Sequence, residues 1–412
     1  MEKDVIVIGA GIVGISTALA LQAEGFPVRI FDRTGVAQEA SKGNAGAFAF
    51  SDIVPLATPG IMRKAPKWLL DPMGPLSVPP DYALKIAPWM LRFWRASWPD
   101  RYRASLMAQA GLMDLARAAL ERQIKATGGA DLIRREGQLQ LFEGEKEFRA
   151  SLPGWEERRR HGIRCELLDS PEAIAGIQPG LDPRFTHAGF TPDWINTTDP
   201  AAWAAHLAHV FRARGGVIEI REVQDIRHAE GQVGLATDKG PVRADKAVIA
   251  AGAWSHHLTR MLGLRIPLET ERGYNTTLPA GAFDLRTHLT FGGHGFVVTR
   301  AGEGVRVGGA VELGGLTRVP DYRRAEILLQ KAAAFLPELK TEGGTRWMGF
   351  RPSLPDSLPV IGPAPGASGV ILAFGHGHLG LTQSAATGEL AAALAAGRDP
   401  ALPLEPFSPA RF

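Results

Sequence analysis

The chain has 412 residues, enough for about two or three domains with sizeable cores. Its 45% hydrophobic and 22% charged residues are typical of a soluble globular protein, and they exclude a disordered chain, a coiled coil and a collagen-like repeat. The 46 Lys and Arg residues against 43 Asp and Glu residues give a net charge of +3, and without a basic block this does not favour nucleic-acid binding.

The first residues predict one complete βαβ unit. Val5–Ile8 is a continuous apolar run, typical of a strand buried on both faces of a parallel sheet. The glycine-rich run 9–14 follows, and residues 15–24 are expected to form a helix. A second strand over 28–31 ends at Asp32.

Hydrophobic periodicity predicts the further helices and strands of the chain. The segment 55–80 is expected to hold little secondary structure, because it is rich in Pro, Trp and Gly. Helices are predicted over 106–126, 199–214, 322–335 and 379–396, and strands over 137–142, 217–220, 231–237, 246–251, 266–278, 296–299, 305–309, 347–351 and 370–374. Helical units at both ends around a strand-rich middle indicate a nucleotide-binding domain assembled from distant segments, with a second domain inserted into it.

The glycine run predicts a dinucleotide site. Gly9 allows the tight turn, Gly11 lets the backbone approach a pyrophosphate, and Gly14 lets the helix pack close to the strand. Asp32 is placed to accept the ribose hydroxyls, which argues against a 2′-phosphate, although the adjacent Arg33 weakens that argument. The alternative is a purely structural Gly-rich turn.

The remaining global features indicate a soluble protein in a reducing, cytoplasmic setting. The only cysteine is Cys165, so there is no internal disulfide and no cysteine-based metal cage. Acidic residues near the N-terminus contradict a secretory signal, and no stretch reaches the roughly 20 uninterrupted apolar residues of a membrane helix. His206 with His209, and His256 with His257, lack further ligands, so no metal site is predicted.

The glycine fingerprint alone does not distinguish an NAD site from an FAD site. Several motifs along the chain help to distinguish them. They are Gly9–Gly14 with Asp32, Ser41-Lys-Gly-Asn-Ala-Gly46, Val248-Ile-Ala-Ala-Gly-Ala-Trp-Ser255, Glu271-Arg-Gly-Tyr274, Gly349-Phe-Arg-Pro352 and Gly375-His-Gly-His-Leu-Gly-Leu-Thr382. Together they resemble the D-amino acid dehydrogenase family of FAD-dependent amine oxidoreductases, related to glycine oxidase and D-amino acid oxidase. Within that family the last motif is similar to bacterial dehydrogenases of D-hydroxyproline and related cyclic imino acids.

The resemblance, which spans nearly the whole chain, implies noncovalently bound FAD and an α/β fold. The implied fold has a Rossmann-type FAD-binding domain built from discontinuous segments, 1–55, 197–265 and 346–412. An inserted α+β substrate domain, dominated by an antiparallel sheet, would comprise 56–196 and 266–345.

Matched residue by residue, the resemblance also implies a cofactor site. The ADP half would contact Gly9, Gly11, Ile12, Val13, Gly14, Asp32 and Arg33, with Val223 at the adenine. The pyrophosphate and flavin would meet Ser41, Asn44, Ala45, Gly46 and Gly252, and N–H groups of Gly380, Leu381 and Thr382 would face the pyrimidine end of the flavin.

Three side chains are the candidate catalytic residues. Arg351 matches the arginine with which the related superfamily holds the substrate carboxylate. A guanidinium suits this task because it can form a bidentate pair with a carboxylate. The alternative is a structural pair of Arg351 with Asp356. Tyr274 would place a hydroxyl over the pocket unless it is a core tyrosine. His378 has either a site role or a backbone bond in its loop, and His294 is a weaker candidate.

The resemblance implies oxidation of the CH–N bond of a D-amino or cyclic D-imino acid, by hydride transfer from Cα to flavin N5, and the D configuration rests on the resemblance alone. The apolar run Ala47–Phe50 beside the flavin favours a cyclic substrate of the D-proline or cis-4-hydroxy-D-proline type. The alternatives are a sarcosine- or glycine-type oxidase, a 2-hydroxy-acid oxidoreductase, and a non-catalytic electron-transfer subunit. Oxygen, a quinone or an electron-transfer protein would accept the electrons.

A mixed aromatic and basic stretch within 64–103 has two interpretations. It contains Trp68, Trp89, Arg92, Phe93, Trp94, Arg95 and Trp98. Either it contacts a membrane surface peripherally, at the inner face of the cell membrane, or it forms core and lid of the inserted domain.

Overall fold

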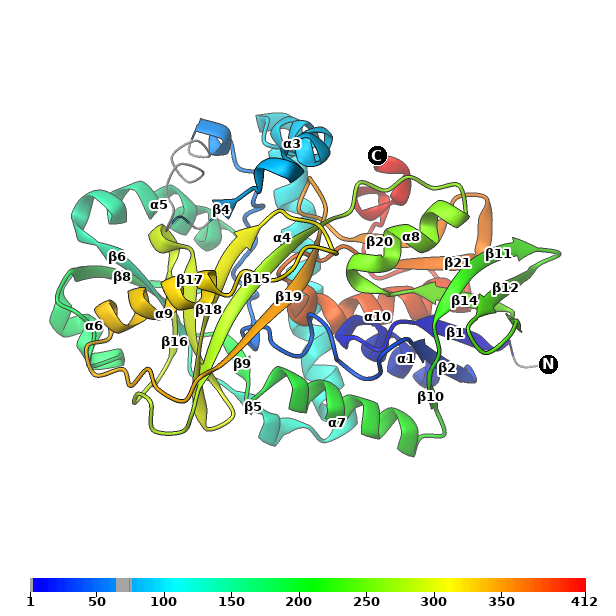
Figure 1. Cartoon of the computed structure of the whole chain (residues 1–412), viewed down its shortest axis with the longest axis horizontal. Coiled ribbons are helices and arrows are strands. Elements are labelled where there is room, and N and C mark those ends of the chain that lie inside the picture. The colour runs from blue at the N-terminus through cyan, green and yellow to red at the C-terminus, as the bar shows by residue number, and fades with distance from the viewer. Residues whose placement is uncertain (1–2, 64–73, 75) are drawn as a thin grey trace.

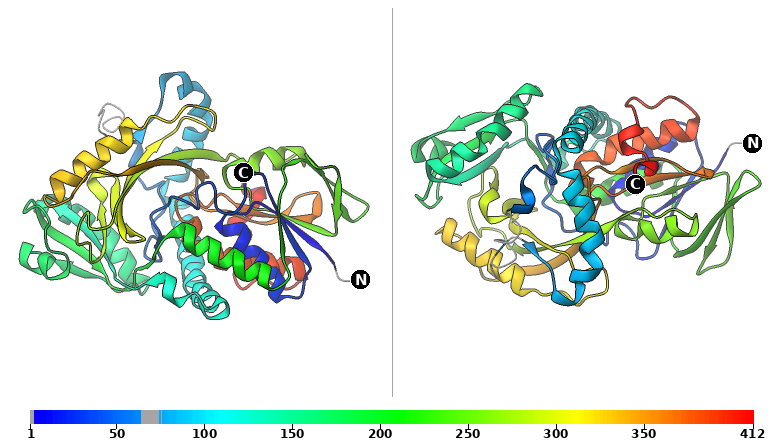
Figure 2. Two further views of the ribbon diagram at one scale, coloured as in Figure 1. Left: turned by 60° about the horizontal axis from the view of Figure 1, so that its bottom comes forward. Right: turned by 90° about the horizontal axis from the view of Figure 1, so that it is seen from above.

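The structure is a computed structural model that describes residues 3–63, 74 and 76–412; Trp68 of the aromatic stretch lies outside the described residues. Two sheets lie side by side in Figure 1, one on the right that holds both ends of the chain and one on the left formed mostly by its middle. Figure 2 shows helices covering the outer faces of both sheets.

The first sheet has six strands in the order β10-β2-β1-β14-β21-β20, all parallel except the edge strand β20. In chain order they are β1 (Val5–Ile8), β2 (Val28–Asp32), β10 (Val217–Ile220), β14 (Lys246–Ile249), β20 (Val360–Ala364) and β21 (Ala367–Phe374). The beginning, middle and end of the chain thus share one sheet, as predicted.

Both faces of this sheet are covered, which explains the continuous apolar run of β1. Val5 and Val7 pack among helices on one face, while Ile6 and Ile8 point to the other. The helices are α1 (Ile12–Ala23), α4 (Pro99–Thr127), α7 (Pro200–Ala213) and α10 (Gly380–Ala396). The opposite face packs on α8 (Ser255–Met261) and on a small antiparallel sheet of β11 (Val223–Ala229), β12 (Gln232–Thr237) and β13 (Val242–Ala244).

The second sheet has nine strands and is mainly antiparallel, in the order β19-β15-β18-β17-β16-β6-β8-β7 with β4 beside β18. The strands are β4 (Leu76–Ser77), β6 (Gln138–Glu143), β7 (Glu166–Leu168), β8 (Phe185–Thr191), β15 (Glu269–Leu278), β16 (His288–Phe291), β17 (Phe296–Ala301), β18 (Gly304–Glu312) and β19 (Thr345–Ser353). Its core packs on α6 (Pro171–Ile177) and α9 (Arg323–Phe335). The predicted α/β class with a mainly antiparallel second sheet is confirmed.

A short third sheet and two more helices complete the fold. The sheet comprises β3 (Ala47–Phe48), β5 (Ile133–Arg134) and β9 (Ile195–Thr197), and the helices are α3 (Ala83–Ala96) and α5 (Gly144–Arg160). Among the described residues, no helix is both long and apolar enough to cross a membrane.

The packing of two segments bears on the predicted division into domains. β19 pairs with β15 in the nine-stranded sheet, although 346–412 was assigned to the cofactor domain. Helix α4 packs against α10 on the six-stranded sheet, although 56–196 was assigned to the substrate domain. The domain boundaries themselves stay a prediction.

Candidate active site

A cavity of about 670 Å³ is lined by residues from both large sheets. On one side it meets the carboxyl ends of the parallel strands β1, β2, β14 and β21, where open α/β sheets usually bind their ligands. On the other side its walls come from β6, β15, β16, β18 and β19. The cavity therefore connects the glycine fingerprint with the nine-stranded sheet.

The fingerprint glycines occupy positions where no side chain fits. Gly9 has φ +113°, and a Cβ there would lie 2.4 Å from the carbonyl oxygen of Ala250. A Cβ on Gly14 would lie 1.9 Å from the carbonyl oxygen of Gly9, so α1 can approach β1 closely only with glycine at this position. The result is a bare backbone turn at the cavity wall, as a pyrophosphate requires.

Polar groups beside this turn fix the surrounding loops. The Asp32 carboxylate accepts hydrogen bonds from the backbone N–H groups of Ala10, at 2.7 Å, and Gly35, at 2.8 Å. The Ser41 hydroxyl accepts from the N–H of Ile12 at 2.9 Å, at the start of α1. These acceptors stand where the ribose and pyrophosphate of a dinucleotide were predicted.

The loop from Ser41 to Gly46 is held from the nine-stranded sheet. The Arg306 guanidinium donates to the carbonyl oxygen of Asn44 at 2.6 Å, and the Asn275 amide donates to that of Gly43 at 2.6 Å. Neither Arg306 nor Asn275 was predicted as a site residue. Both line the cavity and keep this loop between the two sheets.

Most of the predicted cofactor residues line the cavity. These are Gly9, Gly11, Ile12, Val13, Asp32, Arg33, Ser41, Asn44, Ala45, Val223, Gly252, Gly380 and Leu381. Gly14, Gly46 and Thr382 lie behind the wall instead. The Gly46 carbonyl accepts from Thr197 N–H at 2.7 Å, and the Thr382 hydroxyl accepts from Ala49 N–H at 2.9 Å.

Aromatic and charged side chains that contact one another form the wall of the cavity near Asp32. The guanidinium carbon of Arg33 lies 3.7 Å from the ring centre of Trp254, and its Nη2 pairs with Glu39 at 2.7 Å. His257 and Glu222 also line this end, next to the predicted adenine contact Val223. Trp254 belongs to the 248–255 motif but was not predicted as a site residue, and the motifs gave no signal for His257 or Glu222.

Arg351 lies at the far end of the cavity, on β19. Its guanidinium lies over Gly273 of β15, where a Cβ would come within 2.2 Å of Nη2, and its Nη1 donates to the carbonyl oxygen of Ala310 at 2.9 Å. Burial lowers the pKa of Arg351, while the neighbouring Glu271 raises it. Arg351 forms no ion pair among the described residues; Asp356, its predicted structural alternative, pairs with Arg411 at 2.7 Å.

The comparisons with known proteins are consistent with this geometry. The sequence profile of the family described as FAD dependent oxidoreductase matches residues 4–394. The chain belongs to this family. It is an enzyme, an oxidoreductase whose cofactor is FAD, and the bare glycine turn and the long cavity fit that dinucleotide.

Relatives of this FAD-dependent oxidoreductase cover its whole length. A D-amino-acid oxidase from Bradyrhizobium diazoefficiens is 35% identical over 418 residues, which is 100% of this chain and 99% of the relative. A D-amino acid dehydrogenase from Rhizobium johnstonii is 32% identical, with 99% of each chain covered. Glycine oxidase from Geobacillus kaustophilus has the same fold, with a TM-score of 0.80 at 22% identity, covering 100% of this chain and 99% of that one.

His378 of this oxidoreductase lies in the loop between β21 and α10. It lines the cavity, and its exposed surface faces that space. Burial lowers its pKa below the usual value, although Asp52 and Glu271 raise it. The ring is therefore neutral at pH 7. By contrast, His376 is buried beneath the loop, where its Nε2 lies 2.9 Å from the Thr387 hydroxyl, and burial lowers its pKa to about 3.

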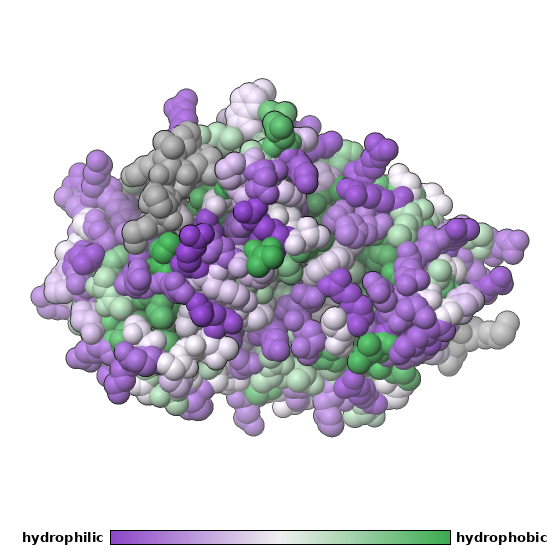
Figure 3. All heavy atoms as spheres, viewed as in Figure 1, coloured by the Kyte–Doolittle hydropathy of each residue, from purple (hydrophilic) through white to green (hydrophobic). Residues whose placement is uncertain are grey.

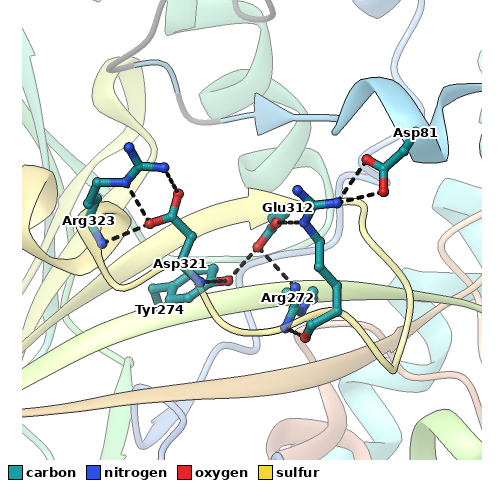
Figure 4. A network of polar contacts seen from close by, with 7 residues as sticks. Asp81, Arg272, Tyr274, Glu312, Asp321 and Arg323 are labelled. Atoms are coloured by element: carbon teal, nitrogen blue, oxygen red, sulfur yellow. Dashed lines mark hydrogen bonds and ion pairs between the residues drawn. The ribbon is translucent and has the colours of Figure 1, made fainter.

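Tyr274 does not offer its hydroxyl to the cavity, so that expectation is corrected. The ring contributes to the wall, but the hydroxyl donates to Glu312 and accepts from the N–H of Asp321 at 3.2 Å. Figure 4 shows Tyr274 in a network that continues through Glu312 to Arg272. Burial and Glu312 raise the pKa of Tyr274 to about 12, so this hydroxyl stays protonated.

His294 and the apolar run 47–50 also differ from expectation. His294 pairs with Glu143 at 3.0 Å and does not line the cavity. Phe48 and Phe50 are buried in the core with Trp203, so only Ala47 and Ala49 reach the cavity wall. Polar side chains at this end were missed: Asp52, Gln138, Gln140, Arg158, Glu271, His288 and Thr290.

Proposed function

We propose that this enzyme oxidises the CH–N bond of a D-amino acid or a cyclic D-imino acid. The observation that carries the proposal is the half-buried guanidinium of Arg351, which lines the cavity and forms no ion pair with a carboxylate among the described residues. A guanidinium with free donors at a cavity wall favours a carboxylate ligand, because the two form charge-assisted hydrogen bonds. The names of the two bacterial relatives support the D-amino acid substrate class.

In the proposed mechanism the protein positions and polarises the substrate. When bound, FAD supplies the two-electron acceptor for the hydride that leaves Cα. Arg351 would bind the carboxylate through two parallel N–H donors and so fix the orientation of Cα. The neutral ring of His378 would accept a hydrogen bond from the substrate amine, whose lone pair must be free when the hydride leaves.

Helix α10 contributes an electrostatic effect to the same end of the cavity. Its first residues, Gly380 and Leu381, line the wall, and the helix runs for 17 residues away from it. The positive end of the helix dipole and the free N–H groups there would stabilise negative charge that develops during the reaction. Positioning and electrostatics are then the main tasks of the protein.

The substrate that we favour is D-proline or cis-4-hydroxy-D-proline. The resemblance of the 375–382 motif supports this proposal, and so do the methyl groups of Ala47 and Ala49 in the wall. Gln138 and Gln140 on β6 offer hydrogen bonds that a ring hydroxyl would use. Comparing kcat/KM for D-proline, cis-4-hydroxy-D-proline, D-alanine and D-arginine tests the proposal; a clear preference for D-arginine would contradict it.

The activity itself is tested by anaerobic absorbance spectra of the purified holoenzyme. We expect the flavin bands to bleach on addition of a pool of D-amino and D-imino acids, and splitting the pool identifies the substrate. Bleaching by sarcosine, glycine or 2-hydroxy acids alone would assign one of the alternative activities. A flavin that no substrate bleaches until a partner protein is added would indicate an electron-transfer subunit.

The identity of the electron acceptor and the cytoplasmic location stay predictions. The predicted peripheral contact with a membrane depends on the residues that α3 exposes. Trp89 and Phe93 stack at 5.3 Å within a small core, so they serve the inserted part of the fold. Leu84, Leu91 and Trp94 are instead exposed, and Figure 3 shows hydrophobic side chains at the surface over this helix. We propose that this exposed side of α3 contacts the headgroup region of a membrane.

A further inference from the structure

Glu271 is a buried carboxylate next to the proposed carboxylate receptor. It lies on β15 directly opposite Arg351 on β19, so both side chains project from the same face of the sheet. The residue is only 6% exposed, and it lines the cavity. A negative and a positive side chain therefore share one wall at the substrate end.

These two side chains do not pair with each other, because Gly273 provides another place for the guanidinium. Arg351 extends over Gly273 and donates to the Ala310 carbonyl oxygen, and it forms no ion pair with Glu271. Among the described residues no hydrogen bond or ion pair reaches the Glu271 carboxylate, although its charge interacts with those of Arg351 and His378. Opposite charges are thus held near each other but apart.

The neighbouring acids on these strands are satisfied, which sets Glu271 apart. Glu269 accepts a hydrogen bond from the Tyr82 hydroxyl at 3.0 Å, and Glu312 is bound by Tyr274 and Arg272. A buried carboxylate without a donor is costly, so an open position beside it favours a cationic ligand group. The charged and titratable groups that interact with Glu271 are Arg351, on the same wall of the cavity, and His378, which in turn interacts with Asp52.

We propose that Glu271 binds the amino group of the substrate while Arg351 binds its carboxylate. The inference rests on the proposed function and adds a residue that selects the substrate class. A zwitterion satisfies both side chains, whereas a 2-hydroxy acid or another amine-free carboxylate leaves Glu271 buried and unpaired. Glu271 therefore makes the cavity discriminate CH–N donors from CH–O donors.

The same carboxylate has a second, opposite effect on the reaction. A nearby negative charge favours the protonated form of the bound amine, and the hydride leaves only from the neutral amine. Glu271 thus strengthens substrate binding but raises the pH at which flavin reduction reaches half of its maximal rate. A residue with a merely structural role would not move these two quantities in opposite senses.

The test compares the wild-type holoenzyme with Glu271→Gln, using D-proline and its oxygen analogue tetrahydro-2-furoate as ligands. For D-proline, anaerobic stopped-flow reduction gives the apparent Kd and the pH midpoint; for the analogue, perturbation of the flavin spectrum gives the Kd. We expect the Kd of D-proline to rise about tenfold or more, while that of the analogue falls or stays constant. The pH midpoint should fall by about one unit.

Two further variants keep the test decisive. Glu269→Gln removes a satisfied acid from the same strand and should leave the ratio of the two Kd values unchanged. Glu271→Asp keeps the charge and should retain most of the discrimination, and it serves if the glutamine variant does not fold. An unchanged ratio and pH midpoint in Glu271→Gln would overturn the inference while leaving the proposed activity intact.

The inference and the proposed function fail in different ways. If no amino acid bleaches the wild-type flavin, the proposed function is wrong. D-proline then becomes an unreactive zwitterion, and the same spectral titration of both ligands still decides whether Glu271 recognises an amino group. Equal loss of affinity for both ligands in Glu271→Gln would show that the residue supports the wall only.

Discussion

Arg351 is held by the backbone rather than by acids, and this distinguishes it from the many paired arginines of the surface. Its Nη1 bonds the carbonyl oxygen of Ala310, and Gly273 leaves the space in which the guanidinium lies. Because no carboxylate among the described residues forms an ion pair with it, its remaining donors are free to bind a ligand in the cavity. The planar guanidinium of an arginine binds a carboxylate with better geometry than the ammonium group of a lysine does.

We predict that Arg351→Lys lowers kcat/KM for the best amino acid by roughly 100-fold or more, because the bidentate contact is lost and the shorter reach leaves the substrate poorly oriented. Steady-state kinetics and the Kd of tetrahydro-2-furoate measure the effect. Arg346→Lys is the matched control on the same strand, since Arg346 pairs with Glu326 at the surface. Equal effects of the two substitutions would contradict the assignment.

Two buried neutral histidines predict an acid-sensitive stability. Burial lowers the pKa of His288 and of His376 to about 3, while both would titrate near 6.5 in the unfolded chain. Below pH 6.5 the unfolded state binds more protons, so the free energy of unfolding should fall by roughly 1 kcal/mol per pH unit for each residue. The contribution of these two neutral histidines to the free energy of unfolding is fully present above pH 6.5 and is lost as the pH falls towards 3.

Urea unfolding at pH 7.5, 5.5 and 4.5 measures this dependence. His376→Gln should reduce the slope of stability against pH between 6.5 and 4, while the exposed His209→Gln should leave the slope unchanged. A wild-type stability that does not change between pH 7.5 and 4.5 would contradict the prediction.

At the scale of elements, the packing of α1 against its neighbours depends on missing side chains. A Cβ on Gly14 would lie 1.9 Å from the Gly9 carbonyl oxygen, and one on Gly388 of α10 would lie 2.7 Å from that of Ser16. Glycine thus permits the close approach of α1 both to the turn below it and to α10. The same helix start faces the dinucleotide end of the cavity.

We predict that Gly14→Ala lowers the free energy of unfolding by about 1–3 kcal/mol and weakens FAD binding, since α1 must move away from the turn. Thermal unfolding and the Kd of FAD for the apoenzyme measure both effects. Gly176→Ala in helix α6 is the control, because a Cβ there meets nothing within 4 Å. This control should be neutral or stabilising.

The βαβ unit could be predicted from the sequence because each of its signals is local. The apolar run of β1, the glycine spacing and the acid after β2 all lie within the first 32 residues. Helix α5 gave no comparable signal, since Trp155 is its one fully buried side chain and charged residues dominate the rest. Helix α3 was hidden by Pro88 and its mixed composition.

The substrate end could be predicted only in part, because the face of a strand depends on its pairing. The motif 271–274 marked the right strand, yet alternation places Glu271 beside Arg351 and directs the Tyr274 hydroxyl into the network with Glu312. The sequence motif made Tyr274 the candidate and did not single out Glu271. Register across β15 and β19 decides between them, and register is a long-range property.

At the scale of the whole molecule, the exposed apolar residues of α3 predict weak, salt-sensitive membrane binding. Leu84 and Leu91 are 89% and 63% exposed, and Lys85 and Arg92 lie beside them in sequence. We expect the protein to sediment with vesicles that contain anionic phospholipid, and Leu84→Ser with Leu91→Ser to abolish this. Ile220→Ser, at the edge strand β10, is the control; equal loss in both variants, or no sedimentation of the wild type, would contradict the contact.

The six-stranded sheet also determines when this protein can become an enzyme during its synthesis. Strand β1 is synthesised long before β14 and β21, which complete its sheet, and α1 packs on α10, which follows β21. Contacts between such distant segments form late and slowly. We therefore expect a nascent chain that stops before residue 367 to bind no flavin, so that cofactor loading follows the synthesis of β21 and α10.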